Sequence, residues 1–141
     1  MILLDTNIVS EGLRPRPDAN VRKWLDSQRP TDLFICMPVL AELRYGLELL
    51  PTGARRIHLE IAIRKTEEAF AERILPFDRT AAYEYGRILA HRDRLGRSTG
   101  TMDGLIAAIA KVHGATLATR DLRGFTDIDL DLIDPFEPPA N

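Results

Sequence analysis

The chain has 141 residues, of which 45% are hydrophobic and 28% are charged, and its formal net charge is −2. A chain of this length builds a core without disulfides, so we expect a single domain over residues 1–141. The single cysteine, Cys36, excludes an internal disulfide and favours a reducing cytoplasm. The sequence contains no apolar run long enough for a membrane helix and no start typical of a signal peptide, so we expect neither.

Strands and helices alternate in the first half of the chain. Residues 2–4 are a short apolar run without alternation, which is typical of a strand buried on both faces of a parallel sheet. After a proline-rich loop, Asp18 is placed to cap a helix with apolar residues spaced by three and four. Residues 33–36 predict a second buried strand, and Pro38 predicts the start of the next helix. A long polar-faced helix is expected over 55–73.

The second half continues the alternation. A short strand is expected at 74–77, and helices are expected at 80–95 and 101–113, each followed by a glycine that is suited to end it. Residues 116–119 predict a fourth buried strand. Residues 130–133 predict an edge strand, because apolar residues there alternate with aspartates.

This order predicts an α/β protein, built as a three-layer α/β/α sandwich with a mainly parallel central sheet of about five strands. In such sheets, ligands bind at the carboxyl ends of the strands. Acidic residues that follow a strand, or that lie in the first turns of a helix beginning at this rim, are expected to converge there. They are Asp5, Glu42, Asp103 and Asp121.

Each acid also has a simpler explanation. The Asp-Thr-Asn run at 5–7 is typical of a turn or a helix cap. Asp103 complements a helix dipole, although it lies beside an apolar stripe, where an unpartnered carboxylate is rare. Glu42 fits a helix surface, where Gly46 one turn later leaves room beside it, and Asp121 fits a solvated turn. The site hypothesis therefore depends on the four acids meeting.

Four carboxylates at one rim would repel one another, and a divalent cation would remove that repulsion. Mg²⁺ and Mn²⁺ prefer carboxylate and water oxygens, whereas three scattered histidines offer no zinc site. The residues alone thus predict an acidic pocket that holds Mg²⁺ or Mn²⁺ and acts on a phosphate-containing substrate.

Four blocks carry a family resemblance: MILLDTN at 1–7, VLAELRYG at 39–46, DGLIAA at 103–108 and ATRD at 118–121. Together they resemble the PIN-domain ribonucleases, and more narrowly the VapC-type toxins of bacterial type II toxin–antitoxin systems. The ILPFD run at 74–78 and the LRP loop at 13–15 point to the FitB-like subgroup.

The resemblance implies a single PIN domain that is a metal-dependent endoribonuclease. In that family the metal activates a water that attacks a phosphodiester, so a protein nucleophile is unnecessary. The implied catalytic and metal-binding residues are Asp5, Glu42, Asp103 and Asp121, and the implied polar supports are Thr6, Asn7 and Thr119. Asp5 and Asp103 are expected to be direct ligands.

Partners follow from the same resemblance: a VapB- or FitA-like antitoxin, an RNA substrate, and a second copy of the chain in a homodimer or a larger assembly. Two other functions stay open. A haloacid-dehalogenase-like phosphatase would use Asp5 as its nucleophile, although Asn7 stands where a second aspartate is usual. A non-catalytic interaction module would show no metal-dependent cleavage of RNA.

The small net charge conceals a segregation. Residues 1–123 contain all 19 basic residues and 16 of the 21 acidic ones. Most of the basic residues are arginines, which suit bidentate contact with phosphate. We expect RNA contacts from Arg92, Arg94, Arg97 and Arg120, although a solvated helix face also explains the first three.

Overall fold

A five-stranded sheet forms the centre of the computed structural model, which describes residues 1–140; Asn141, the last residue of the predicted domain, lies outside the described part. The strand order is β3-β2-β1-β4-β5, and every neighbouring pair is parallel. The strands are β1 (Ile2–Leu4), β2 (Leu33–Cys36), β3 (Ile74–Leu75), β4 (Thr116–Ala118) and β5 (Leu132–Ile133). The predicted parallel sheet is confirmed.

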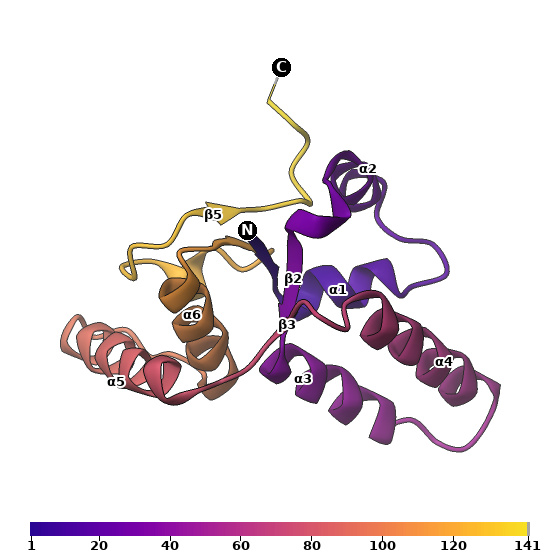
Figure 1. Ribbon diagram of the computed structural model, residues 1–141, viewed down its shortest axis with the longest axis horizontal. Coiled ribbons are helices and arrows are strands. Elements are labelled where there is room, and N and C mark those ends of the chain that lie inside the picture. Colours follow the sequence, from indigo (N-terminus) through magenta and orange to yellow (C-terminus); the bar gives the residue numbers. More distant parts are fainter. Residues whose placement is uncertain (141) are drawn as a thin grey trace.

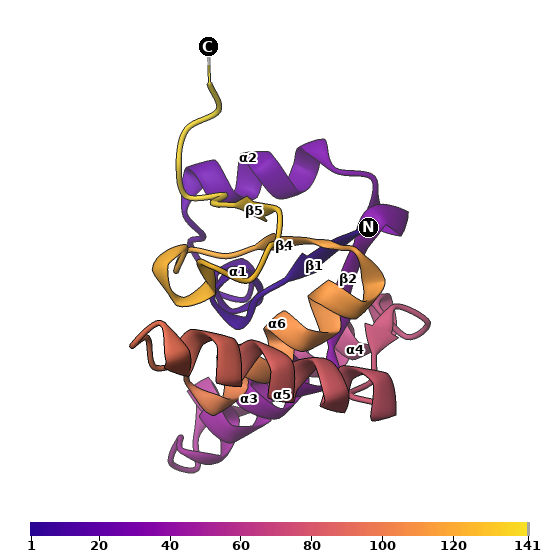
Figure 2. The same cartoon turned by 90° about the vertical axis from the view of Figure 1, so that its left-hand side faces the viewer.

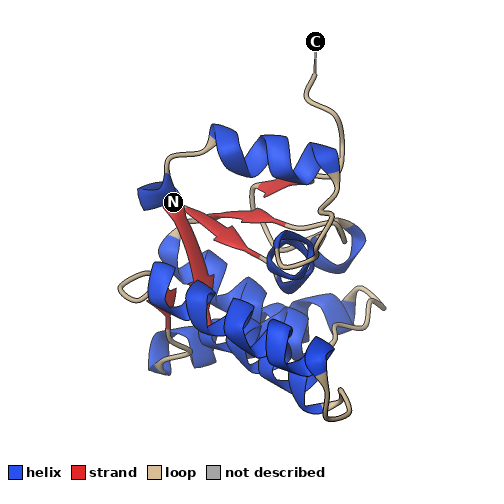
Figure 3. Ribbon diagram, turned by 90° about the vertical axis from the view of Figure 1, so that its right-hand side faces the viewer, coloured by secondary structure: helices blue, strands red, loops and turns tan. Residues whose placement is uncertain are grey.

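Helices cover both faces of this sheet. They are α1 (Thr6–Gly12), α2 (Ala19–Ser27), α3 (Met37–Glu48), α4 (Ala54–Ala69), α5 (Arg79–Arg94) and α6 (Thr101–His113), with 3₁₀ turns η1 (Pro30–Asp32) and η2 (Arg123–Phe125). Figure 1 shows α5 and α6 on one side of the strands and α1, α2 and α4 on the other. Figure 3 shows the short strands enclosed between helices. The predicted three-layer sandwich is therefore confirmed.

Cap geometry confirms several predicted helix boundaries. Asp18 Oδ1 accepts hydrogen bonds from the backbone N–H groups of Asn20 and Val21, at 2.9 and 3.2 Å, at the start of α2. Pro38 lies in the first turn of α3. Gly114 ends α6 with a φ of 61°, a left-handed conformation that glycine adopts without steric cost.

Two helices are not given correctly by the sequence pattern. The Asp-Thr-Asn run indicates a turn or a helix cap after β1 without bounds for a helix, and in the structure Asp5 is the N-cap of α1. The helix predicted to end at residue 73 ends at Ala69 instead. The chain must leave α4 by then, because the carbonyl of Arg73 accepts a hydrogen bond from the N–H of Ile35 at 3.1 Å, next to the pairing of β3 with β2.

The central strands are buried on both faces, as their unbroken apolar runs predict. Leu3, Ile35 and Leu117 have no exposed surface. Cys36, at the end of β2, is equally buried, and this burial raises the pKa of its thiol to about 12. None of the helices in residues 1–140 is long and apolar enough to span a membrane.

The C-terminal segment returns to the N-terminal part of the chain. After β5 it runs past α2, as Figure 2 shows. The Asn20 side-chain amide donates a hydrogen bond to the carbonyl of Phe136 at 2.9 Å. This contact joins α2 to the far end of the described chain.

Candidate active site at the carboxyl edge of the sheet

Asp5 lies at the middle of the sheet edge, directly after the central strand β1. Its side chain is 4% exposed. Oδ1 accepts a hydrogen bond from the N–H of Thr6 at 2.8 Å, and Oδ2 accepts one from the hydroxyl of Thr119 at 2.7 Å and one from Asn7 Nδ2 at 3.3 Å. Asp5 is therefore a helix cap and a rim carboxylate at once, so the two interpretations of this residue are compatible.

The three predicted polar supports all lie at this rim. Thr119 is fully buried, and its Oγ1 accepts a hydrogen bond from the N–H of Asp121 at 3.1 Å while its hydroxyl donates to Asp5. The Thr6 hydroxyl donates to Glu42 Oε1 at 2.6 Å. Thr119 thus connects the first acid to the last, and Thr6 connects α1 to the second acid on α3.

Asp103 and Asp121 approach one another over a glycine. Asp103 is half-buried in the first turn of α6, and Asp121 is exposed, with Oδ1 accepting a hydrogen bond from the N–H of Gly124 at 3.1 Å. A Cβ built on Gly124 would lie 2.7 Å from Asp121 Oδ2 and 3.5 Å from Asp103 Oδ2. Only a residue without a side chain leaves this space open, so Gly124 belongs to the site although the sequence pattern did not indicate it.

Electrostatics couples the four carboxylates. The pKa of Asp103 is raised to about 6, first by burial and then by the negative charges of Asp5, Asp121 and Glu42. The pKa of Asp5 is also raised, again first by burial, with Glu42 and Asp121 contributing. The structure thus brings all four predicted acids to one rim.

The rim is not a closed coordination shell. Within residues 1–140, no three Asp, Glu, His or Cys side chains lie close enough together to hold a metal ion by themselves. A cation here would therefore keep part of its coordination as water, which is how Mg²⁺ is usually bound.

The four predicted RNA-binding arginines differ in position. Arg94 and Arg97 are exposed, and Arg97 pairs with Asp127 at 3.0 Å. Arg120 is exposed beside Asp121, with its guanidinium 4.5 Å from the centre of the Phe136 ring. Arg92 is only 3% exposed, so the expectation that it contacts RNA does not fit the structure.

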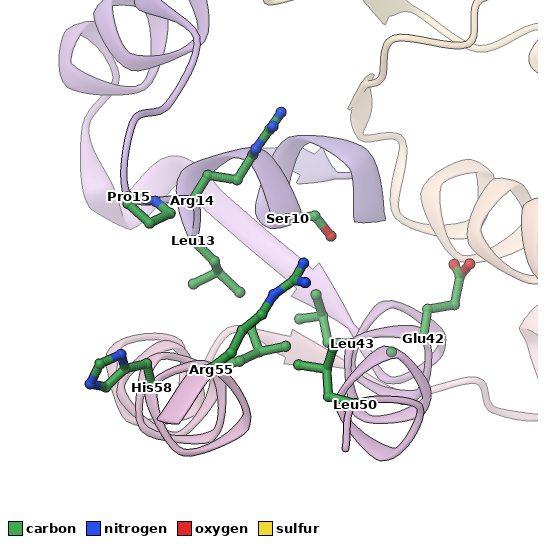
Figure 4. Close-up of a pocket in the computed structure, with 11 residues that line it drawn as sticks. Ser10, Leu13, Arg14, Pro15, Glu42, Leu43, Leu50, Arg55 and His58 are labelled. Carbon is green, nitrogen blue, oxygen red and sulfur yellow. The ribbon is translucent and has the colours of Figure 1, made fainter. Parts of the chain in front are cut away.

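A cavity of about 580 Å³ lies beside the rim, between α1, α3 and α4. Figure 4 shows the Arg55 side chain reaching between the leucines that line it, with Glu42 at one end. Gly46 lines the same cavity, and a Cβ added to it would meet nothing within 4 Å, so the open space there does not depend on the glycine. The second acid thus borders both the rim and the cavity.

Comparison with known proteins assigns the family. Residues 2–130 match the PIN domain family. The chain is 40% identical to VapC ribonuclease Y4jK of Sinorhizobium fredii, over 98% of this chain and 99% of that one, and 41% identical to Toxin FitB of Neisseria gonorrhoeae, over 96% and 99%. A solved structure of FitAB bound to a DNA fragment superposes with a TM-score of 0.93 at 39% identity and covers 99% of both chains. The chain therefore belongs to the PIN domain family, among its VapC- and FitB-type members.

Proposed function

We propose that this protein is a toxin of a toxin–antitoxin pair and that it cleaves RNA internally as a metal-dependent endoribonuclease. The observation that carries the proposal is the convergence of Asp5, Glu42, Asp103 and Asp121 on one sheet edge in a chain of this family. VapC relatives that are named as ribonucleases support the choice of RNA as substrate.

The donor set suits Mg²⁺ or Mn²⁺. All four candidate ligands are carboxylates, which hard divalent cations prefer. The raised pKa values of Asp5 and Asp103 reflect a desolvated negative cluster, which a cation would stabilise. Asp5 and Asp103 are the proposed direct ligands, and Glu42 and Asp121 complete the set directly or through water.

The chain's own residues orient the reaction. Bound metal would lower the pKa of a water molecule and stabilise charge on the phosphate. Thr119 and Thr6 hold Asp5 and Glu42 in fixed orientations through the hydrogen bonds described above. Asn7 helps to hold Asp5, and its Oδ1 accepts a hydrogen bond from the N–H of Arg120 at 3.3 Å, which keeps that arginine beside the rim.

We place the antitoxin in the cavity beside Glu42. The cavity is lined by apolar side chains such as Leu13, Leu43 and Leu59, with Arg14 and Arg55 among them. An antitoxin segment with apolar anchors and an acidic group would match this lining. Because Glu42 borders both cavity and rim, an occupant there would also obstruct the site.

We propose that the toxin forms a homodimer. We also propose that it works in the cytoplasm, where its RNA substrates are. Tyr45 on α3, Leu49 directly after α3 and Tyr83 on α5 are 66–67% exposed, which is unusual for large apolar side chains and typical of contact surfaces.

The test is cleavage of RNA by the purified chain and by Asp5→Asn. Wild type is expected to cut a mixed RNA pool internally when Mg²⁺ or Mn²⁺ is present and to stop when EDTA is added, and Asp5→Asn should lose at least about 100-fold in rate. Sequencing of 5′ ends after brief induction in cells would map the same cuts.

The controls separate this function from the alternatives. Asp26→Asn, on the exposed face of α2, should cut at the wild-type rate. A covalent phosphoaspartate on Asp5 would indicate the phosphatase mechanism instead. Failure of pure wild-type protein to cut any RNA with either metal would contradict the proposal and favour a binding module.

A further inference from the structure

Arg92 is a buried arginine that the proposed chemistry does not use. It lies near the end of α5 with 3% of its surface exposed. Its Nε donates a hydrogen bond to Thr99 Oγ1 at 2.7 Å, and its Nη1 donates to the backbone carbonyl of Thr126 and, at 3.3 Å, to Thr126 Oγ1. A guanidinium is kept in an interior only when such partners offset its loss of hydration.

These partners belong to the two segments that present the third and fourth acids. Thr99 immediately precedes Gly100, the N-cap of α6, and the first turn of α6 carries Asp103. Thr126 immediately follows η2, which contains Gly124, the residue whose N–H binds Asp121. The planar guanidinium of Arg92 therefore bridges the segment before α6 and the segment after η2.

We propose that Arg92 is a positioning residue that fixes the separation of Asp103 and Asp121 by holding Thr99 and Thr126 in one plane. This inference rests on the proposed metal site. Lysine keeps the charge but lacks the rigid fork, so it cannot donate to both partners in the same geometry. The Arg97–Asp127 pair joins the same two segments at 3.0 Å, but it is exposed, and such pairs contribute little.

The decisive variant removes one acceptor and leaves the arginine in place. Thr99→Val deletes the hydroxyl that accepts from Nε at nearly constant volume, and Thr99→Ser keeps it. We expect Thr99→Val to bind Mn²⁺ about 10–100-fold more weakly than wild type in calorimetry of the intact protein, and Thr99→Ser to restore binding. Arg92→Lys should weaken binding in the same direction. Arg79→Lys, at the exposed start of α5, should match wild type.

Melting temperatures and crystal structures of the same variants complete the test. In Thr99→Val, the Asp103 and Asp121 carboxylates are expected to move apart relative to wild type. Wild-type Mn²⁺ affinity in Thr99→Val, even with a lower melting temperature, would show that Arg92 only stabilises the fold. That result would overturn this inference and leave the proposed metal site unaffected. A wild-type protein that binds no Mn²⁺ would overturn the proposed metal site and this inference together.

Discussion

Asp103 shows how the site costs stability when no cation is bound. Its folded-state pKa of about 6 lies above the ordinary value of 3.8, so between these values the folded protein binds more protons than the unfolded chain. The free energy of unfolding of metal-free protein should therefore decrease as the pH rises through this window. Above it, the charged carboxylate destabilises the fold.

The variant Asp103→Asn removes the carboxylate charge and tests whether that charge destabilises the metal-free protein. In EDTA at about pH 7.5, we expect the variant to melt about 2–4 °C above wild type, a gain on the order of 1 kcal/mol after allowance for solvent screening, and to have lost cleavage. Near pH 4, wild-type Asp103 is largely protonated and the difference should nearly vanish. Asp26→Asn should leave the melting temperature unchanged at both pH values. If Asp103→Asn is less stable than wild type at neutral pH, the charged Asp103 carboxylate does not destabilise the metal-free fold.

At the scale of elements, the packing of α5 against α6 fixes where Asp103 lies. A Cβ on Gly104 would lie 2.7 Å from Leu89 Cδ1 and 2.8 Å from Tyr85 Cε2, so the helices approach closely at the residue after Asp103. Gly86, on α5, has nothing within 4 Å of its Cβ position. The two glycines therefore allow a paired comparison, because Gly104 lies at a close helix contact and Gly86 lies in open space.

Alanine should act oppositely at these positions. Gly104→Ala is expected to lower the free energy of unfolding by about 1–3 kcal/mol through overpacking, and to slow cleavage because Asp103 moves with α6. Gly86→Ala should raise the free energy of unfolding by up to about 1 kcal/mol, since alanine is the better helix former. Urea denaturation measures both, and equal effects at the two positions would contradict this description of the interface.

Strand runs and strand polarity were sufficient to predict the sheet and the rim on which the four acids lie. They could not decide between a turn and the seven-residue helix α1, because the Asp-Thr-Asn run at its N-terminus suits a turn as well as a helix cap. Arg92 was expected on the RNA-facing surface because it stands among several arginines, and its burial was not predicted, although it follows the buried Ile88 by one helical turn. The part played by Gly124 depends on a contact between distant segments, which no local pattern encodes.

At the scale of the whole molecule, basic residues are the expected means of holding RNA around an acidic rim. Arg120 is exposed next to Asp121 and is stacked on Phe136, so its guanidinium is held near the place where a phosphate would approach. Binding of this kind releases counterions and therefore weakens as salt rises.

Arg120→Gln should make cleavage less sensitive to salt. For one lost phosphate contact to a single strand, the slope of log kcat/KM against log salt should become less steep by about 0.7. Arg22→Gln, on the exposed side of α2, should keep the wild-type slope. An unchanged slope in Arg120→Gln would remove this residue from the RNA contact surface.

The burial of Cys36 determines how the protein responds to thiol reagents. Only the thiolate reacts with oxidants and alkylating agents, and a pKa of about 12 leaves almost none at neutral pH. The chain has no other cysteine, so the folded protein presents no reactive thiol. A cysteine introduced at an exposed position would be the sole attachment point for a fluorophore or spin label, so distances within the toxin and its complexes can be measured without background from the native thiol.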